Sequence, residues 1–200
     1  MLRLGHIVTE TGGESMEQKG ITLWFTGLSG AGKTTVARLV EERLNREHRL
    51  RVQLLDGDVL REVMNRDLGF SKEDRFMHIQ RAAFIAKLLT DHGVIVLASF
   101  ITPYQEMRDY CRRQIENYAE IYVKCPLNVC MERDVKGLYK KALAGKIDHF
   151  TGISDPYEEP VNPDLVIETL AETPEESAER VIQYLSRQRS IPGLAAGEHL

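Results

Sequence analysis

Residues 27–34 have the composition of a loop that binds phosphate groups. They read Gly-Leu-Ser-Gly-Ala-Gly-Lys-Thr and match the pattern Gly-x-x-x-x-Gly-Lys-Ser/Thr. Glycines let a backbone curl until its N–H groups point inward at an anion. Lys33 can reach the outer phosphates, and the Thr34 hydroxyl can ligate magnesium. The pattern therefore predicts a site for a nucleoside triphosphate or a compound of that shape.

The residues on both sides of this loop fit a strand and a helix. Residues 21–26 form an apolar, β-prone run, and residues 36–44 carry apolar side chains at helical spacing. A loop in this position lies at a helix N-terminus, whose partial positive charge favours an anion. A plain glycine turn would fit the glycines too, but it leaves Lys33 and Thr34 unexplained.

Two aspartates follow the next strand-like run, residues 51–55. Asp56 and Asp58 end this run, and residues 99–102 end a third one. Ligands of open α/β sheets bind at the carboxyl ends of the strands, so we expect these residues beside the phosphate loop. One carboxylate can hold magnesium through water while the other orients or deprotonates an attacking hydroxyl. The alternative is a turn in which Asp58 caps the next helix.

Composition narrows the class of protein. A chain of 200 residues fits one domain with a full core, and its net charge of −4 argues against a general nucleic-acid binder. No apolar run is long enough to span a bilayer, and residues 1–20 lack the apolar centre of a signal peptide. Cys111, Cys125 and Cys130 lack zinc-ligand spacing, so we expect reduced thiols in a cytoplasmic protein. We expect neither a nucleic-acid nor a membrane partner.

Strand-like and helical stretches alternate along the chain, which is typical of an α/β fold with a mostly parallel sheet. We expect five strands, at residues 21–26, 51–55, 94–98, 119–124 and 165–168. The first expected helix follows the phosphate loop, the second spans residues 59–65, and the third runs from a Ser71 cap to His92. Three more are expected: one from Pro103 toward Tyr118, one that starts at Pro126, and one from a Thr173 cap to Arg187. This predicts a P-loop NTPase-like fold over residues 20–187, with a flexible extension at 1–19 and a flexible tail at 188–200.

The stretch from Ala144 to Asp164 interrupts that alternation. Glycines and prolines are spread along it, with charged and aromatic residues between them. Long irregular segments inside a domain are usually functional or disordered. Two aromatics, Phe150 and Tyr157, and the lysines that precede them favour a lid over bound phosphates, at about residues 136–164. A solvated, lysine-rich loop explains this segment alone equally well.

Five strings of residues point to a known family: 24–35, 55–58, 68–75, 133–142 and 150–153. In these strings the chain resembles the adenylyl-sulfate kinase (APS kinase) family of P-loop kinases, and the resemblance spans roughly residues 19–185. Many families share the phosphate loop, whereas Lys-Gly-Leu-Tyr at 136–139 and Phe-Thr-Gly-Ile at 150–153 are far more specific. The family implies phosphorylation of adenosine 5′-phosphosulfate by ATP at the 3′-hydroxyl, which gives ADP and 3′-phosphoadenosine 5′-phosphosulfate for sulfate assimilation.

The resemblance also implies which residues bind each ligand. ATP would contact Gly27, Leu28, Ser29, Gly30, Ala31, Gly32, Lys33, Thr34, Thr35 and Arg133. The acceptor nucleotide would contact Asp58, Arg61, Phe70, Arg75, His78, Ile101, Lys136, Leu138, Phe150, Thr151 and Gly152. Mg²⁺ would be held by Thr34 and, through water, by Asp56.

Within these sets the resemblance implies particular roles. Asp58 would lie near the 3′-hydroxyl, while Lys33 and Lys136 would steady the transferring phosphoryl group. Arg61 and Arg75 would grip the phosphosulfate, because guanidinium groups suit phosphate and sulfate oxygens. Phe70 and Phe150 would enclose the substrate adenine between their faces.

The chain departs from the family's pattern at His78, Gln80, Thr102 and Gln105. His78 stands where the family has asparagine, and its protonation would make binding sensitive to pH. Thr102 stands at a serine for which a phosphoenzyme role has been described, although direct in-line transfer needs no covalent intermediate. Gln105 replaces an arginine near the edge of the substrate site. Each departure is compatible with the family's reaction, and together they also allow a kinase for another nucleotide-like acceptor.

A nucleotide-dependent switch without transfer chemistry is a third reading. A GTPase switch would usually contain Asn-Lys-x-Asp, which this chain lacks, and it would need no acceptor site. For partners, the resemblance implies a homodimer and a functional link to ATP sulfurylase.

Overall fold

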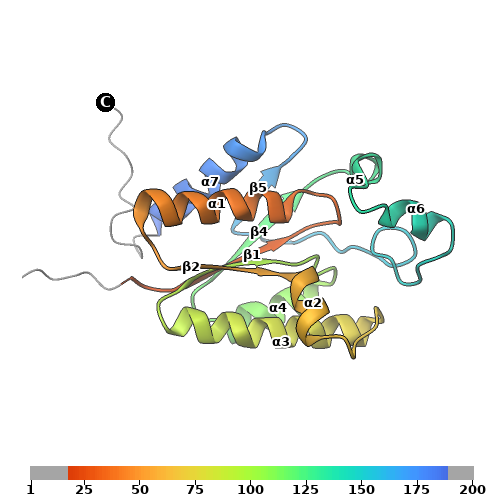
Figure 1. Cartoon of the computed structure of the whole chain (residues 1–200), viewed down its shortest axis with the longest axis horizontal. Helices are drawn as coiled ribbons and strands as arrows, with labels where there is room; N and C mark the ends of the chain where they lie inside the picture. The colour runs from red at the N-terminus through yellow and green to blue at the C-terminus, as the bar shows by residue number, and fades with distance from the viewer. Residues whose placement is uncertain (1–17, 189–200) are drawn as a thin grey trace, which may run out of the picture.

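The computed structural model describes residues 18–188, which form one parallel β-sheet covered by helices on both faces (Figure 1). The sheet consists of β1 (Ile21–Thr26), β2 (Val52–Asp56), β3 (Ile95–Ser99), β4 (Tyr118–Lys124) and β5 (Leu165–Glu168). Its strand order is β2-β3-β1-β4-β5, and every neighbouring pair is parallel. The predicted α/β class with five parallel strands is confirmed.

Two helical layers bury the faces of this sheet. On one face lie α1 (Lys33–His48) and α7 (Pro174–Arg187), and on the other lie α2 (Gly57–Met64), α3 (Lys72–Asp91) and α4 (Gln105–Gln114) (Figure 1). Side chains of β1 point alternately to the two faces of the sheet. Leu23 and Phe25 pack in the core under α1 and α7, whereas Trp24 packs in the core under α3 and α4. All three side chains have no exposed surface, so the central strand is buried on both sides.

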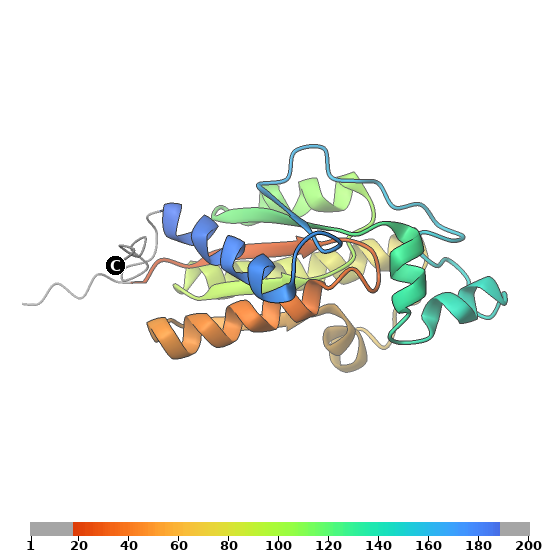
Figure 2. The ribbon, with the colours of Figure 1, turned by 90° about the horizontal axis from the view of Figure 1, so that it is seen from above.

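Two short helices, α5 (Leu127–Arg133) and α6 (Leu138–Leu143), lie beyond the carboxyl ends of the strands (Figure 2). The chain then returns along the side of the sheet to β5 without further helix or strand, apart from an isolated bridge between Thr151 and Asp155. The predicted lid region thus starts with a helix, and only its second part is irregular. Its return path is held by the Glu158 N–H, which donates to the Pro103 carbonyl at 2.8 Å.

Several predicted element ends are confirmed by their caps. Ser71 Oγ accepts a hydrogen bond from the Asp74 N–H at the start of α3, and Thr173 forms a capping box with Glu176 at α7. The helix predicted from Pro103 toward Tyr118 is shorter than expected. It begins at Gln105 and ends at Gln114, because Ile115 adopts an extended backbone and is buried on the way into β4.

The remaining expectations concern the termini, cysteines and membrane. Most of the predicted extension and tail lies outside the described residues, but the Gln18 side chain donates to the carbonyls of Arg51 and Gly93. All three cysteines are buried free thiols. Within residues 18–188, no helix is long and apolar enough to cross a bilayer.

Candidate active site

The phosphate loop connects β1 to α1 and needs glycine at its first position. Gly27 has φ 148°, and a Cβ atom there would lie 2.4 Å from the Val123 carbonyl oxygen. Lys33 curls back over the loop, and its Nζ donates to the carbonyls of Gly27 at 2.9 Å and Leu28 at 2.7 Å. Burial lowers the pKa of Lys33 to about 8, although nearby Asp58 acts in the opposite direction. The loop thus holds a buried cation at its centre.

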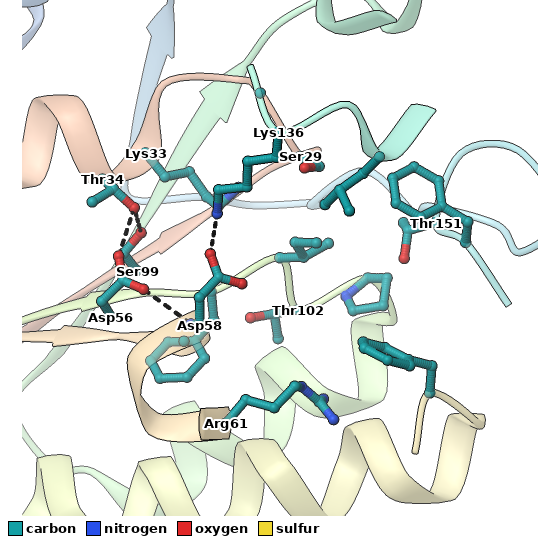
Figure 3. Close-up of a pocket in the computed structure, with 18 of the residues that line it drawn as sticks. Ser29, Lys33, Thr34, Asp56, Asp58, Arg61, Ser99, Thr102, Lys136 and Thr151 are labelled. Atoms are coloured by element: carbon teal, nitrogen blue, oxygen red, sulfur yellow. Dashed lines mark hydrogen bonds and ion pairs between the residues drawn. The ribbon is translucent and has the colours of Figure 1, made fainter. Parts of the chain in front are cut away.

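Asp56 joins this loop to the second strand. Its Oδ2 accepts a hydrogen bond of 2.9 Å from Thr34 Oγ1, and its Oδ1 accepts the Asp58 N–H at 2.9 Å (Figure 3). The Thr34 hydroxyl also lies 3.0 Å from Ser99 Oγ on β3. Asp56 is therefore the N-cap of α2, and the expectation that Asp58 caps this helix is wrong because Asp58 lies inside its first turn.

Asp58 projects from α2 and forms an ion pair with Lys136, which precedes α6 (Figure 3). Both side chains are well exposed, so water screens their attraction. The contact brings together two residues that lie 78 positions apart in the chain. A carboxylate and an ammonium group thus stand at the mouth of the phosphate loop.

Two arginines surround Phe70. The guanidinium carbon of Arg61 lies 4.6 Å from the centre of the Phe70 ring, and that of Arg75 lies 5.6 Å away. Arg61 Nη1 donates to the Gly69 carbonyl at 2.7 Å, while Arg75 Nε donates to the Phe70 carbonyl at 2.9 Å. These bonds fix a loop that carries positive charge beside an aromatic ring, and 49% of the Phe70 surface remains exposed.

Phe150 reaches the same region from the segment after α6. It is buried and packs edge-on against Tyr139, with ring centres 5.0 Å apart. The Tyr139 hydroxyl donates to the Ser29 carbonyl at 2.9 Å, so the lid region is attached to the phosphate loop. Nothing in the Tyr139 position within the Lys-Gly-Leu-Tyr string indicated this contact.

A cavity of about 770 Å³ connects these groups. Most of the site residues predicted from the sequence line it: Ser29, Gly30, Gly32, Lys33, Thr34, Thr35, Asp56, Asp58, Arg61, Phe70, Arg75, His78, Ile101, Thr102, Lys136, Leu138, Phe150 and Thr151. Gly27, Leu28, Ala31, Arg133 and Gly152 are not among its lining residues. Leu28 and Gly152 instead line a neighbouring cavity, and Arg133 donates to the Thr169 carbonyl at 2.9 Å.

The residues that depart from the family's pattern have different surroundings. Burial lowers the pKa of His78 to about 4, so the charge change expected near neutral pH moves to acid. Gln105, expected near the edge of the substrate site, is not among the cavity-lining residues, and its side chain bonds to Asp109 and Arg108. Gln80 is likewise absent from the cavity lining.

Thr102 lies in a strained turn at the floor of the cavity, with φ 46°. Its Oγ1 accepts a hydrogen bond of 2.8 Å from Trp24 Nε1, and its carbonyl accepts one of 2.8 Å from Arg108 Nη1. Arg108 is fully buried and lies 3.4 Å from the carboxylate of Glu120. Sequence reasoning missed Trp24 and Arg108 as supports of the site, because Trp24 was interpreted only as part of a strand and Arg108 only as part of a helix.

A parallel sheet with a phosphate loop after β1, a carboxylate pair after β2 and one cavity that both of them line defines a P-loop kinase. The sequence model of adenylylsulphate kinases matches residues 19–168. The chain belongs to the adenylylsulphate kinase family.

Individual relatives agree with this assignment. The adenylyl-sulfate kinase of Halothermothrix orenii is 60% identical over 174 residues, which cover 87% of this chain and 94% of that protein. The APS kinase CysC of Mycobacterium tuberculosis, solved in complex with AMPPNP and APS, is 45% identical. Its TM-score is 0.81, and the match covers 84% of this chain and 99% of that one. A hexameric APS kinase from Thiobacillus denitrificans is 31% identical with a TM-score of 0.67, over 88% of this chain and 30% of that one.

Proposed function

We propose that this protein transfers the γ-phosphoryl group of ATP to the 3′-hydroxyl of adenosine 5′-phosphosulfate (APS). The products are 3′-phosphoadenosine 5′-phosphosulfate and ADP. One observation carries the proposal: the phosphate loop, the Asp58–Lys136 pair and the Arg61–Phe70–Arg75 cluster face a single cavity. A module that only binds a nucleotide would need the phosphate loop alone, whereas a kinase also needs the Asp58–Lys136 pair and the Arg61–Phe70–Arg75 cluster. The complex of the related mycobacterial kinase with AMPPNP and APS supports the same substrate pair.

The chain's own residues divide the work of phosphoryl transfer. In the proposal, Lys33 and the loop amides hold the β- and γ-phosphates, and Asp58 orients the 3′-hydroxyl and accepts its proton. Lys136, which pairs with Asp58 in this structure, would release it and neutralise charge on the transferring group. Positioning and charge neutralisation supply most of the catalysis in this type of reaction.

The donor set at Thr34 and Asp56 fits Mg²⁺, a cation that prefers oxygen ligands. The hydroxyl and the carboxylate lie 2.9 Å apart at the edge of the phosphate loop, with Ser99 Oγ beside them. When bound, the metal would neutralise phosphate charge. Thr34 would ligate it directly and Asp56 would hold one of its waters.

The acceptor's two ends call for different surfaces. Arg61 and Arg75 provide positive charge for the phosphosulfate, while Phe70 and Phe150 provide aromatic faces for the adenine. His78, Ile101, Leu138, Thr151 and Gly152 complete the proposed acceptor set. We assign no phosphoenzyme role to Thr102, because its hydroxyl is buried and bonded to Trp24.

The proposal extends to assembly and cellular setting. We infer a homo-oligomer, because a related APS kinase is described as hexameric, and we take the homodimer from the family resemblance. Light scattering coupled to gel filtration measures the mass directly. We also infer a reducing, cytoplasmic setting, in keeping with three free thiols, and a functional link to ATP sulfurylase as the source of APS.

The decisive experiment measures ADP release from MgATP with APS, against a panel of other adenine and cytidine nucleotides. We expect rapid turnover with APS alone. Turnover with a different acceptor would identify a related kinase in which His78, Gln80 and Gln105 alter specificity. ATP binding without turnover on any acceptor would favour the nucleotide-dependent switch.

A further inference from the structure

His78 differs from the asparagine that the resemblance leads one to expect, and it lies in the wall of the cavity. The ring projects from α3, is 6% exposed and packs beside Phe100 with ring centres 5.4 Å apart. A neutral imidazole has one N–H donor and one bare nitrogen acceptor. Which nitrogen carries the proton decides what the ring can offer to a ligand.

The hydrogen bond to Asn65 settles this question. Asn65 ends α2, is 2% exposed, and its Nδ2 lies 2.6 Å from His78 Nδ1. An amide NH₂ group can only donate, so Nδ1 of the ring must be the bare acceptor. A proton on Nδ1 would place two donors against each other inside the protein.

Arg81 determines which way the Asn65 amide points. Its Nη1 lies 2.8 Å from Asn65 Oδ1, and since a guanidinium only donates, the atom facing it must be the amide oxygen. Arg81 is itself fixed by two hydrogen bonds to Asp67, at 2.9 and 2.8 Å, and by one to the Met64 carbonyl at 3.2 Å. The chain Asp67–Arg81–Asn65 therefore presents an NH₂ group to the ring.

The other surroundings of His78 are consistent with a neutral ring. Arg61 on α2 and Arg81 on α3 both disfavour a positive charge there, and burial does so more strongly. Asp58 and the Gly57 backbone act in the opposite direction. Burial outweighs these two groups, so the ring is neutral at neutral pH.

We propose that Asp67, Arg81 and Asn65 are positioning residues that hold His78 as the neutral tautomer with its proton on Nε2. Because His78 lines the cavity, this N–H is then the group that the ring offers to an acceptor atom of the bound nucleotide. The second half of this proposal rests on the proposed function, whereas the tautomer itself does not. His78 would thereby replace an asparagine donor without adding a charge to the site.

The tautomer can be measured in the intact protein without substrate. Two-dimensional ¹H–¹⁵N spectra of the imidazole rings distinguish protonated from bare nitrogens, and His78→Asn assigns the signals of His78 among the six histidines. We expect a proton on Nε2, none on Nδ1, and no titration from about pH 8 to about pH 5.5. A proton on Nδ1, or an imidazolium ring at neutral pH, would overturn the inference.

Two variants of Asn65 test whether the network sets this state. Asn65→Leu removes the amide donor and should give a mixture of both tautomers. Asn65→Asp keeps the shape but replaces the donor with a carboxylate oxygen, which should draw a proton onto Nδ1 and move the ring's titration toward neutral pH. If the ring in Asn65→Leu stays wholly in the Nε2–H form, the network does not select the tautomer and the proposal is wrong.

Kinetics connect the tautomer to substrate binding. In Asn65→Asp we expect the KM for APS to change by about fivefold over the pH range in which His78 now titrates, while the KM for ATP does not change. The double variant Asn65→Asp with His78→Asn is the matched control, and its KM for APS should lose this pH dependence. If the Nε2–H form is found but APS is not phosphorylated, the proposed function fails and the tautomer assignment stands.

Discussion

Gly27 offers a sharp test of how closely the phosphate loop approaches the neighbouring strand. In Gly27→Ala the new methyl group would lie 2.4 Å from the backbone oxygen of Val123, at a φ of 148°. Backbone strain of this kind costs about 1–3 kcal/mol, and forcing an atom into a packed site costs about 1–3 kcal/mol more. We therefore expect the free energy of unfolding to fall by about 2–6 kcal/mol.

Gly145→Ala is the matched control for this substitution. Gly145 also has a positive φ, of 66°, but no atom lies within 4 Å of the position of its missing Cβ. Only the left-handed backbone is then penalised, at about 1–2 kcal/mol. Guanidinium denaturation of both variants, followed by fluorescence or circular dichroism, measures the difference. Equal losses in the two variants would refute the argument that the carbonyl of β4 excludes a side chain from the loop.

Three further substitutions or conditions test the site and its support. Asp58→Asn should lower kcat by about 10²- to 10⁴-fold, with little change in the ATP Kd from calorimetry, because it removes the proposed base but not the phosphate loop. A parallel loss of ATP affinity would contradict this role. Glu120→Leu should reduce stability by about 3–5 kcal/mol in thermal or chemical denaturation, because it leaves the buried charge of Arg108 without its partner. Nucleotide affinity should fall above about pH 8, because Lys33 loses its proton there in the ligand-free protein and must regain it when the anionic nucleotide binds. The Lys33→Arg variant stays charged, so its nucleotide affinity should depend less on pH.

Local patterns predicted the sheet and much of the cavity lining. The strand–loop–helix around residues 21–44, the caps at Ser71 and Thr173, and the carboxylates after β2 all depend on neighbours within a few positions. Parallel strands bring their carboxyl ends to one edge, so the meeting of Asp56 with Thr34 followed from the fold class.

The parts that escaped prediction depend on contacts between distant residues. Trp24 reaches Thr102 across 78 positions, and no periodicity in the sequence records such a pairing. The partner of His78 was also unforeseen, since Asn65 lies on the preceding helix. The partners of Gln105 were also unforeseen, because a position at the start of a helix does not determine which way its side chain turns. Here it turns toward Asp109, one helical turn onward.

Asp56 has a consequence for how two ligands influence each other. One of its oxygens accepts from Thr34 in the phosphate loop, and the other caps the helix that carries Asp58 and Arg61. A ligand that draws the first oxygen away from Thr34 also moves the cap of that helix. We therefore expect occupancy of the proposed triphosphate site to be coupled to the geometry of the proposed acceptor site. Such coupling is reciprocal, so an acceptor that orders α2 must change the affinity for the donor nucleotide by the same factor.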